Sequence, residues 1–405
     1  MADLIFLASR MPLPPQHGGD AARAWHMLAR LAEKNRVHLA CFLDHPRDHA
    51  HLPALEQICA SVLCLPVNHA AQRLRSVAAL VQGKPVAMPR ARHPRLQRWI
   101  EETVSGAGVS RAFISGAAMA YHLEDYRFET RVIDLVEVKA ETWRQAADAS
   151  HWPLNEIFWR QERAHLTAEK NAAARCECAL FGSAAEANLF GRRVPRAPAR
   201  IVALRNGIDH AWFSPSGDYP NPYNKGRRPV VFAGDMDYGP NIEGADWFAS
   251  EVMTMLRHRF PAIDFWIVGA HVPRALRALE ARDIRVASRV TDVRPYLAHA
   301  DAVVAPLRVG RGIENNVLEG MAMAKPVVAT PVAVDGLELV NGDEVFSAAS
   351  APGFATGVAA VLSGRAPKMG AKARQRVEAD FGWPATLKLL DEIFAEGEAA
   401  RAGAS

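Results

Sequence analysis

Short apolar runs alternate with helical patterns twice along this chain of 405 residues, and the double alternation constrains the fold more than any other feature. Seven runs in the first half have the length and composition of strands: residues 4–8, 36–43, 61–65, 111–115, 131–135, 178–182 and 201–204. Segments with a helical period lie between them, the clearest at 21–33 and 154–175. This order predicts βαβ units and a parallel sheet that helices cover on both faces.

A segment dense in proline, glycine and asparagine interrupts the pattern at residues 214–228, and its composition predicts an interdomain linker. The alternation then restarts, with strands expected at 230–233, 265–269, 284–287, 302–305 and 326–330 and helices at 242–259, 274–281 and 314–324. We therefore expect domains at 1–213 and 229–382, and a C-terminal helix at 383–405 that packs back toward the first domain. Two consecutive doubly wound domains predict a ligand in the cleft between them, at the carboxyl ends of the strands.

The composition narrows the class of protein. With 49% hydrophobic and 23% charged residues, the chain has the balance of a soluble enzyme. A formal net charge of +4 without a recognition motif argues against nucleic acid as a partner. Five cysteines in no framework spacing are typical of a reducing compartment, and no apolar run reaches membrane-spanning length. These features predict a cytoplasmic protein.

The most informative segment is 306–330, where a buried strand is followed by glycines and then by a helix. Gly310 and Gly312 allow the backbone to approach a ligand closely. The start of the helix, which includes Asn316, directs free N–H groups and the positive end of the helix dipole at an anion such as a phosphate. Glu319 lies further along, where its carboxylate can accept hydrogen bonds from a ribose diol. A solvated helix glutamate is the alternative for Glu319, but loop, helix and following strand all favour the ligand site.

This segment resembles the donor-binding signature of retaining glycosyltransferase family 4, on Glu319-Gly320-Met321-Ala322 and on residues 325–328. The resemblance implies the α/β GT-B fold, two facing Rossmann-like domains with an interdomain cleft. It also implies that a nucleoside-diphosphate sugar is the co-substrate and that Glu319 binds its ribose. The implied donor-binding residues of the second domain are Gly234, Gly310, Arg311, Gly312, Asn316 and Glu319.

Three other segments extend the resemblance over nearly the whole chain. Residues 9–23 follow the first strand and are similar to the glycine loop that faces the donor phosphates, with Gly18 and Gly19 in that role. Residues 206–209 resemble the family's exit from the first domain, and residues 232–241 resemble the first strand of the second. As catalytic residues of the cleft, the resemblance suggests Asp20, Arg23 and Asp134.

The likeness is closest to the sugar transferases associated with exosortase and PEP-CTERM systems. Residues 134–138, 143–145 and 159–163, together with Glu169, are similar to the acceptor-domain pattern of that subgroup. The resemblance implies a polysaccharide or lipid-linked sugar acceptor in exopolysaccharide or cell-envelope biosynthesis.

The chain also departs from its relatives. Arg311 stands where many members carry a second glutamate, and its guanidinium fork suits phosphate oxygens instead. The subgroup favours lysine where this chain has Asn316, and aspartate where it has Glu137 and Lys139. The lost lysine leaves a non-catalytic nucleotide-sugar-binding scaffold open as an alternative. A nucleotide-sugar epimerase of the same fold would need clustered carboxylates and histidine in the cleft, and the sequence offers no such cluster.

No metal is expected. Asp235 and Asp237 have the spacing of a metal motif from a different transferase fold, but no third ligand accompanies them, so a turn is the better interpretation. The leaving diphosphate would then be stabilised by backbone amides and Arg311.

Residues 57–100 contain no aspartate or glutamate and carry the basic side chains Arg73, Arg75, Lys84, Arg90, Arg92, Arg95 and Arg98. Two interpretations stay open. This face meets anionic headgroups at the inner membrane or a lipid diphosphate acceptor, or it is a solvated helix pair whose charges balance acids elsewhere.

Overall fold

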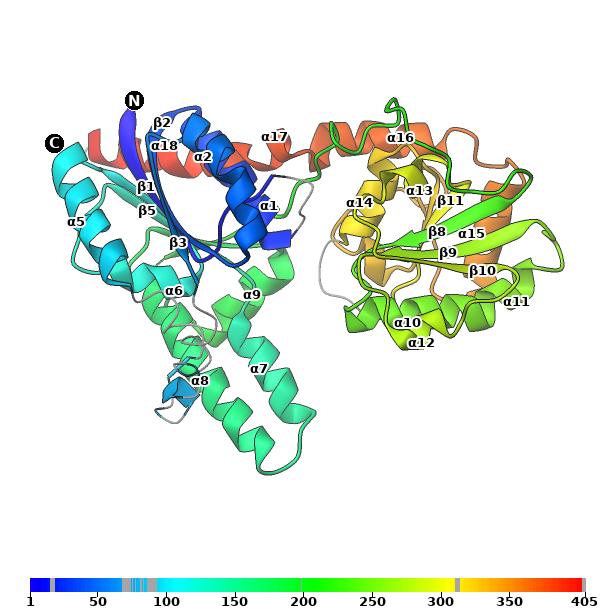
Figure 1. Ribbon diagram of the computed structural model, residues 1–405, viewed down its shortest axis with the longest axis horizontal. Coiled ribbons are helices and arrows are strands. Elements are labelled where there is room, and N and C mark those ends of the chain that lie inside the picture. Colours follow the sequence, from blue (N-terminus) through cyan, green and yellow to red (C-terminus); the bar gives the residue numbers. More distant parts are fainter. Residues whose placement is uncertain are drawn as a thin grey trace. The chain divides into compact units, whose positions relative to one another are not determined.

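The computed structural model divides into two compact units (Figure 1). It describes residues 1–14, 19–67, 74, 76, 78–80, 82, 84–85, 93–197, 199–309 and 314–402. Unit 1 comprises Met1–Arg205 with Leu387–Ser405, and unit 2 comprises Asn206–Thr386. The division after Arg205 falls before the boundary expected at residue 213, so the proline-rich segment 214–228 belongs to unit 2.

The sheet of unit 1 has seven parallel strands in the order β3-β2-β1-β4-β5-β6-β7. The strands are β1 (Ala2–Ala8), β2 (Asn35–Leu43), β3 (Ser61–Pro66), β4 (Arg111–Ser115), β5 (Thr130–Val136), β6 (Cys178–Phe181) and β7 (Arg200–Ala203). The first six follow the doubly wound order 3-2-1-4-5-6, in which the chain reverses direction across the sheet between β1 and β4. The central strands are buried on both faces, which is why they appear in the sequence as continuous apolar runs.

Helices cover this sheet. They are α1 (Gly19–Ala32), α2 (Leu52–Ile58), α5 (Pro94–Ala107), α6 (Ala117–Ala120), α7 (Lys139–Asp148), α8 (Leu154–Ala173), α9 (Ala184–Arg193) and α18 (Lys388–Ala402), with short 3₁₀ turns at Pro46–His51 and Tyr121–Leu123. Helices α7 and α8 pack side by side and extend away from the sheet (Figure 1). Helix α18 is held to α1 by Arg30, whose Nη2 lies 2.6 Å from Asp391 Oδ2. The last segment of the chain therefore completes unit 1.

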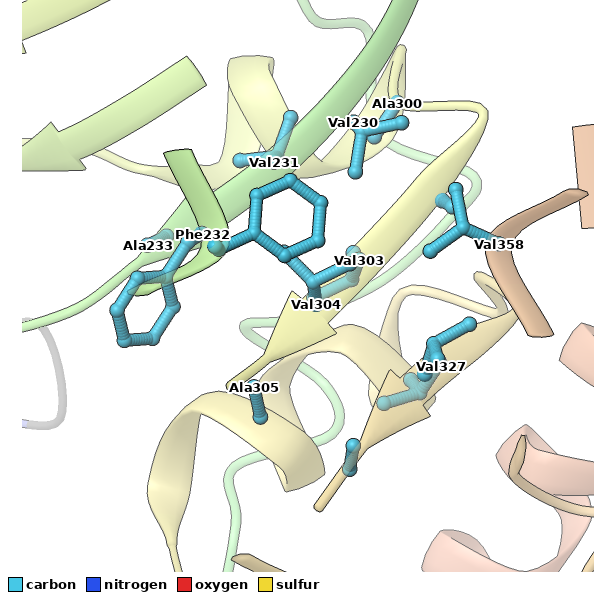
Figure 2. Packing of buried hydrophobic residues seen from close by; sticks show 14 of the residues in the cluster. Val230, Val231, Phe232, Ala233, Ala300, Val303, Val304, Ala305, Val327 and Val358 are labelled. Carbon is cyan, nitrogen blue, oxygen red and sulfur yellow. The ribbon is translucent and has the colours of Figure 1, made fainter. Parts of the chain in front are cut away.

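Unit 2 repeats the same winding with six parallel strands in the order β10-β9-β8-β11-β12-β13. The strands are β8 (Arg228–Ala233), β9 (Ile263–Gly269), β10 (Ile284–Ser288), β11 (Ala302–Ala305), β12 (Val327–Ala329) and β13 (Phe346–Ser347). Figure 2 shows the apolar side chains of β8, β11 and β12 packed together, with Val358 from a covering helix against them. The unit therefore has a core of its own.

The helices of unit 2 are mostly short. They are α10 (Gly239–Trp247), α11 (Met253–Leu256), α12 (Arg274–Arg277), α13 (Arg294–Ala298), α14 (Asn315–Ala322), α15 (Ala351–Leu362), α16 (Met369–Arg376) and α17 (Trp383–Thr386), with π-helical turns at Phe248–Val252 and Val377–Phe381 and a 3₁₀ turn at Val332–Val334. The single helix expected at 242–259 is thus divided by a π-helical turn. Among the described residues of both units, none of the helices combines the length and apolar character needed to cross a membrane.

Candidate functional site

Each unit has its own topological switch point, where neighbouring strands are followed by connections that run in opposite directions. In unit 1 this point lies beyond β1 and β4, and in unit 2 beyond β8 and β11. Open α/β sheets bind their ligands at such edges, so each unit contains one candidate site.

The site of unit 1 is a cavity of about 290 Å³ at the carboxyl ends of β1, β4 and β5. Side chains from α1, α7 and α8 close it from the helical side. Its polar lining includes Ser9, Ser115 and Asp134, which follow or end the three strands, and His165 and Glu169 from α8.

Asp134 and Arg23 form a buried ion pair in this site. Arg23 Nε donates to Asp134 Oδ2 at 2.8 Å and Nη2 donates to Oδ1 at 2.9 Å, with both side chains at most 2% exposed. This two-pronged pairing fixes the Asp134 carboxylate at the cavity wall. Asp20 also lines the cavity, from the exposed first turn of α1, whereas Gly19 begins that helix at φ +60°. Gly18 lies outside the described residues.

The backbone is strained where β5 reaches the cavity. Val136 has φ 65°, a region that β-branched residues rarely adopt, and the register with β6 shifts between Asp134 and Val136. The Val136 carbonyl accepts a hydrogen bond from the Gly182 N–H at 2.6 Å, which helps to hold this conformation. Strain of this kind persists where the surrounding structure imposes it, and it clusters at ligand sites.

Helix α8 places two ionisable groups in the cavity with their pKa values moved in opposite directions. Burial raises the pKa of the Glu169 carboxyl to about 8, although backbone N–H groups of Lys139 and Ala140 bond to it. Burial, with the nearby Lys139 ammonium, lowers the pKa of His165 to about 4. Burial therefore favours the neutral form of both side chains.

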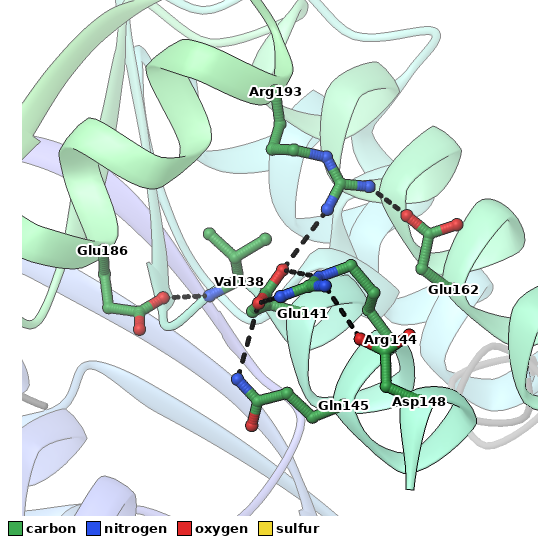
Figure 3. Close-up of polar contacts among 8 residues, drawn as sticks. All are labelled: Val138, Glu141, Arg144, Gln145, Asp148, Glu162, Glu186 and Arg193. Atoms are coloured by element: carbon green, nitrogen blue, oxygen red, sulfur yellow. Dashed lines mark hydrogen bonds and ion pairs between the residues drawn. The ribbon is translucent and has the colours of Figure 1, made fainter. Parts of the chain in front are cut away.

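A polar network ties the helices around this cavity to one another (Figure 3). Glu141 of α7 accepts hydrogen bonds from Arg144 Nε at 2.8 Å and from Arg193 Nη1 of α9 at 3.3 Å. The other nitrogen of the Arg193 fork pairs with Glu162 of α8. Glu186 of α9 accepts from the Val138 N–H at 2.8 Å, just before α7. The network thus holds α7, α8 and α9 as one support for the cavity.

The site of unit 2 is built from backbone and amide groups. Gly234 follows β8, and a Cβ atom placed there would lie 3.3 Å from Asn241 Nδ2 and 3.9 Å from Asn316 Nδ2. The two asparagines stand in the first turns of α10 and α14 and are buried. Asn241 Nδ2 donates to the Asp235 carbonyl at 2.7 Å, while Oδ1 of each asparagine has no partner within the described structure. The amide groups of two asparagines from the first turns of α10 and α14 therefore both approach Gly234.

Glu319 lies one turn beyond Asn316 on α14. Burial raises its pKa to about 8, and burial likewise raises the pKa of Glu314, which precedes the helix, to about 7. Gly310, Arg311 and Gly312 lie outside the described residues. Of the predicted donor residues, the structure thus brings Gly234 and Asn316 together and places Glu319 on the same helix as Asn316.

The Asp235–Asp237 pair forms a turn, in which Asp235 Oδ1 accepts the Asp237 N–H at 3.0 Å. Across the described part of the chain, no three His, Cys, Asp or Glu side chains are grouped so that they could hold a metal ion. The basic stretch is only partly described: Arg95 and Arg98 are exposed on α5, while Arg73, Arg75, Arg90 and Arg92 fall outside the described residues.

Comparisons with known proteins agree with this architecture. Residues 227–364, most of unit 2, match the family model described as glycosyl transferases group 1. The fold is GT-B. The sucrose-phosphate synthase of Thermosynechococcus elongatus superposes with a TM-score of 0.66 at 14% identity, over 99% of this chain and 100% of that one. A glycosyltransferase from Rickettsia africae superposes with a TM-score of 0.65 at 13% identity, over 98% of each chain. HepE of Anabaena, in complex with UDP-glucose, superposes with a TM-score of 0.63 at 13% identity, over 98% of this chain and 100% of that one. No curated protein sequence matches the chain at a significant level.

Two features of the sites were not predicted as such. His165 is one helical turn before Glu169, a spacing that places both on the same face of α8, but a histidine in a long helix carries no distinctive signal by itself. Asn241 ends the segment 232–241 that carried the resemblance, and its position after a glycine and a turn was the available clue.

Proposed function

We propose that this chain transfers a glycosyl group, with retention of configuration and without a bound metal or cofactor, from a nucleoside-diphosphate sugar to a polysaccharide or lipid-linked sugar acceptor. The reaction would serve exopolysaccharide or cell-envelope biosynthesis at the cytoplasmic face of the inner membrane. Unit 2 would bind the donor and unit 1 the acceptor.

The observation that carries the proposal is the arrangement beside Gly234. Helices α10 and α14 both begin there, and a helix start presents free N–H groups and a positive dipole end to an anion. The absence of a side chain at Gly234 leaves room for a diphosphate to approach. We assign the ribose hydroxyls to Glu319, which lies further along α14.

The bond changes follow from the resemblance to retaining transferases. The bond between the anomeric carbon and the phosphate oxygen breaks, and the acceptor oxygen forms its bond to that carbon on the same face. The departing phosphate takes the acceptor proton, so no nucleophile from the protein is needed. The donor site must then stabilise the charge that develops on the diphosphate, with helix N-termini and with Arg311.

A thermal-shift screen identifies the donor. UDP-sugars are the first to test, because HepE was solved with UDP-glucose, and GDP-, ADP- and dTDP-sugars complete the panel. A ligand that binds only the folded state raises the unfolding temperature by linkage, so one nucleotide series should stabilise unit 2 specifically. If no donor in the panel stabilises the chain, the proposal is wrong.

Glu319→Ala tests the assigned ribose contact in an assay of transfer from the radiolabelled donor. Loss of the hydrogen bonds between the ribose hydroxyls and the Glu319 carboxyl group should lower kcat/KM about tenfold to a hundredfold. Glu251→Ala is the matched control, because Glu251 is an exposed glutamate of the same unit. Unchanged transfer by Glu319→Ala would exclude the ribose role. Donor binding without transfer by the native chain would instead favour the scaffold alternative.

A further inference from the structure

Two residues that line the cavity of unit 1 carry a buried polar atom without a partner in the described part of the chain. His165 Nε2 and Glu169 Oε2 are buried and make no hydrogen bond within the described structure. The two residues lie one turn apart on α8, at most 8% exposed, and both line the cavity. Buried polar atoms are nearly always paired in folded proteins, and those left unpaired in a cavity indicate a ligand that pairs with them.

The buried ionic groups that line this cavity are balanced by the protein, whereas Asp20 lines it from an exposed position. Among the described lining residues, Arg10 pairs with Asp44 at 3.1 Å and Lys139 pairs with Glu137, and both cations are more than half exposed. Asp134 is neutralised by Arg23, as described above. Burial favours the neutral forms of His165 and Glu169, which add no charge to this balance. The buried lining thus favours neither a phosphate nor an amine, because a buried charge needs a counter-charge.

The size and walls of the cavity point to the same class of ligand. Its volume of about 290 Å³ is at the small end of the range for small-molecule sites. Small apolar side chains, among them Ala24, Ala117 and Ala168, form walls that suit the C–H faces of a ring. Ser9, Ser115 and the two groups of α8 add hydrogen-bonding positions for hydroxyls.

We propose that this cavity binds one uncharged sugar ring, whose hydroxyls bond to His165 Nε2 and to the Glu169 carboxyl, and that this ring is the terminal residue of the acceptor. A neutral carboxyl group can both donate and accept hydrogen bonds, so it can pair with a sugar hydroxyl that acts as an acceptor or as a donor. The identity of the ring as the acceptor rests on the proposed function, whereas the binding of the ring does not.

Saturation-transfer NMR on the full chain tests the binding directly. The probes are the methyl α- and β-glycosides of glucose, galactose and mannose, with inorganic phosphate followed by its ³¹P line width. At least one glycoside should receive saturation from the protein. The phosphate line should broaden no more with the native chain than with the cavity variants described next.

Five substitutions on or beside α8 locate the binding. His165→Phe and Glu169→Leu should each weaken glycoside binding about tenfold, because each removes a hydrogen bond inside the cavity. Glu169→Gln should stay within about threefold of the native chain, because an amide also donates and accepts. Glu156→Leu and His151→Phe are the matched controls, since both native side chains are exposed. Circular dichroism checks folding, and His165→Phe decides the outcome if Glu169→Leu does not fold.

The outcomes separate this proposal from the proposed function. If the cavity variants lose glycoside binding and the exposed controls keep it, the sugar site is supported, even if no donor is ever turned over. Absence of saturation transfer, equal binding in all variants, or phosphate broadening that the cavity variants abolish would overturn it. Transfer from a nucleotide sugar without any glycoside binding would leave the proposed function standing and remove this site.

Discussion

The two units have the same winding, but different kinds of residue lie at the carboxyl ends of their strands. In unit 1, ionisable side chains occupy that edge: the Arg23–Asp134 pair and the two groups of α8 enclose a cavity. In unit 2, the edge consists of Gly234 and the buried amides at the start of two helices. Strand order therefore determines where a site lies, and the helices that enter that edge determine what it can bind.

One feature is nevertheless shared. Each unit has a glutamate with a raised pKa. Burial raises the pKa of Glu169 in unit 1 and of Glu319 in unit 2 to about 8. Burial causes the rise in both units, and in unit 1 backbone N–H groups of Lys139 and Ala140 oppose it. A carboxylic acid kept neutral at pH 7 can donate a hydrogen bond, which an ionised one cannot.

The largest expected effect comes from breaking the buried pair of unit 1. Asp134→Leu leaves the Arg23 guanidinium, 1% exposed, without its carboxylate partner. Such a loss should destabilise unit 1 by about 3–5 kcal/mol. Chemical denaturation followed by hydrogen exchange, which separates the unfolding of the two units, measures the effect, and unit 2 should keep its stability.

Two control variants sharpen this result. The double variant Arg23→Met with Asp134→Leu replaces the pair by apolar groups and should recover most of the lost stability. Glu124→Ala removes one side of an exposed pair with Arg175 at 3.6 Å and should change stability by less than about 1 kcal/mol. A loss as large for the exposed pair as for the buried one would contradict the contrast drawn between them.

The next effect in size concerns pH. The pKa of Glu169 is raised in the folded state, so its neutral form stabilises unit 1 fully below pH 4.5, and this contribution is lost as pH rises toward 8. Glu169→Gln mimics the neutral acid at every pH. The variant should therefore gain about 2–4 kcal/mol on the native chain between pH 4.5 and pH 8, measured by denaturation of unit 1.

Glu319→Gln is the corresponding experiment in unit 2. It should show the same sign over the same pH range, because burial raises the pKa of Glu319 to about 8 as well. Glu156→Gln, at an exposed position of α8, should leave the pH profile flat relative to the native chain. A profile for Glu169→Gln that is parallel to the native one would show that its carboxyl is ionised and not neutral in the folded protein.

The sequence predicted the layout of the fold closely. Every expected strand is present with its ends shifted by at most two residues, because strands buried on both faces appear as uninterrupted apolar runs. The strand β13 (Phe346–Ser347) was not expected, since two residues are too few to establish any period. The unit boundary was placed late, because loop composition marks the proline-rich segment but not which core it packs against.

The sites could be predicted only in part. The family resemblance named Gly234 and Asn316, which the structure brings beside each other, whereas their role toward a donor stays a prediction. The pairing of Arg23 with Asp134 joins residues 111 positions apart and depends on the position of α1 across β5, which no local pattern encodes. The positive φ of Val136 is likewise imposed by tertiary contacts, because valine itself disfavours that conformation.

The smallest expected effects distinguish packing from binding within unit 2. A Cβ atom at Gly244 would lie 2.7 Å from the Pro306 carbonyl oxygen, so Gly244→Ala must move α10 and should cost about 1–3 kcal/mol of stability. At Gly234 the nearest atom is Asn241 Nδ2 at 3.3 Å, and a shift of that amide should cost less than about 1 kcal/mol. Thermal unfolding of each variant without ligand gives both values.

The same variants are then unfolded in the presence of the stabilising nucleotide sugar. Gly234→Ala, which costs less stability than Gly244→Ala without ligand, should lose more of the stabilisation that the donor provides. Gly234→Ala occupies the space through which a diphosphate would approach and displaces the amides beside it, so the stabilisation by the donor should be largely lost. Gly244→Ala should keep most of it, and Gly239→Ala, whose Cβ would meet no atom within 4 Å, should match the native chain in both measurements. Because Gly239 and Gly244 lie on α10 and Gly234 directly after β8, a loss confined to Gly234→Ala would assign the donor to the edge of the sheet. Equal loss in Gly234→Ala and Gly244→Ala would instead mean that the whole helix, and not the space beside Gly234, determines donor binding.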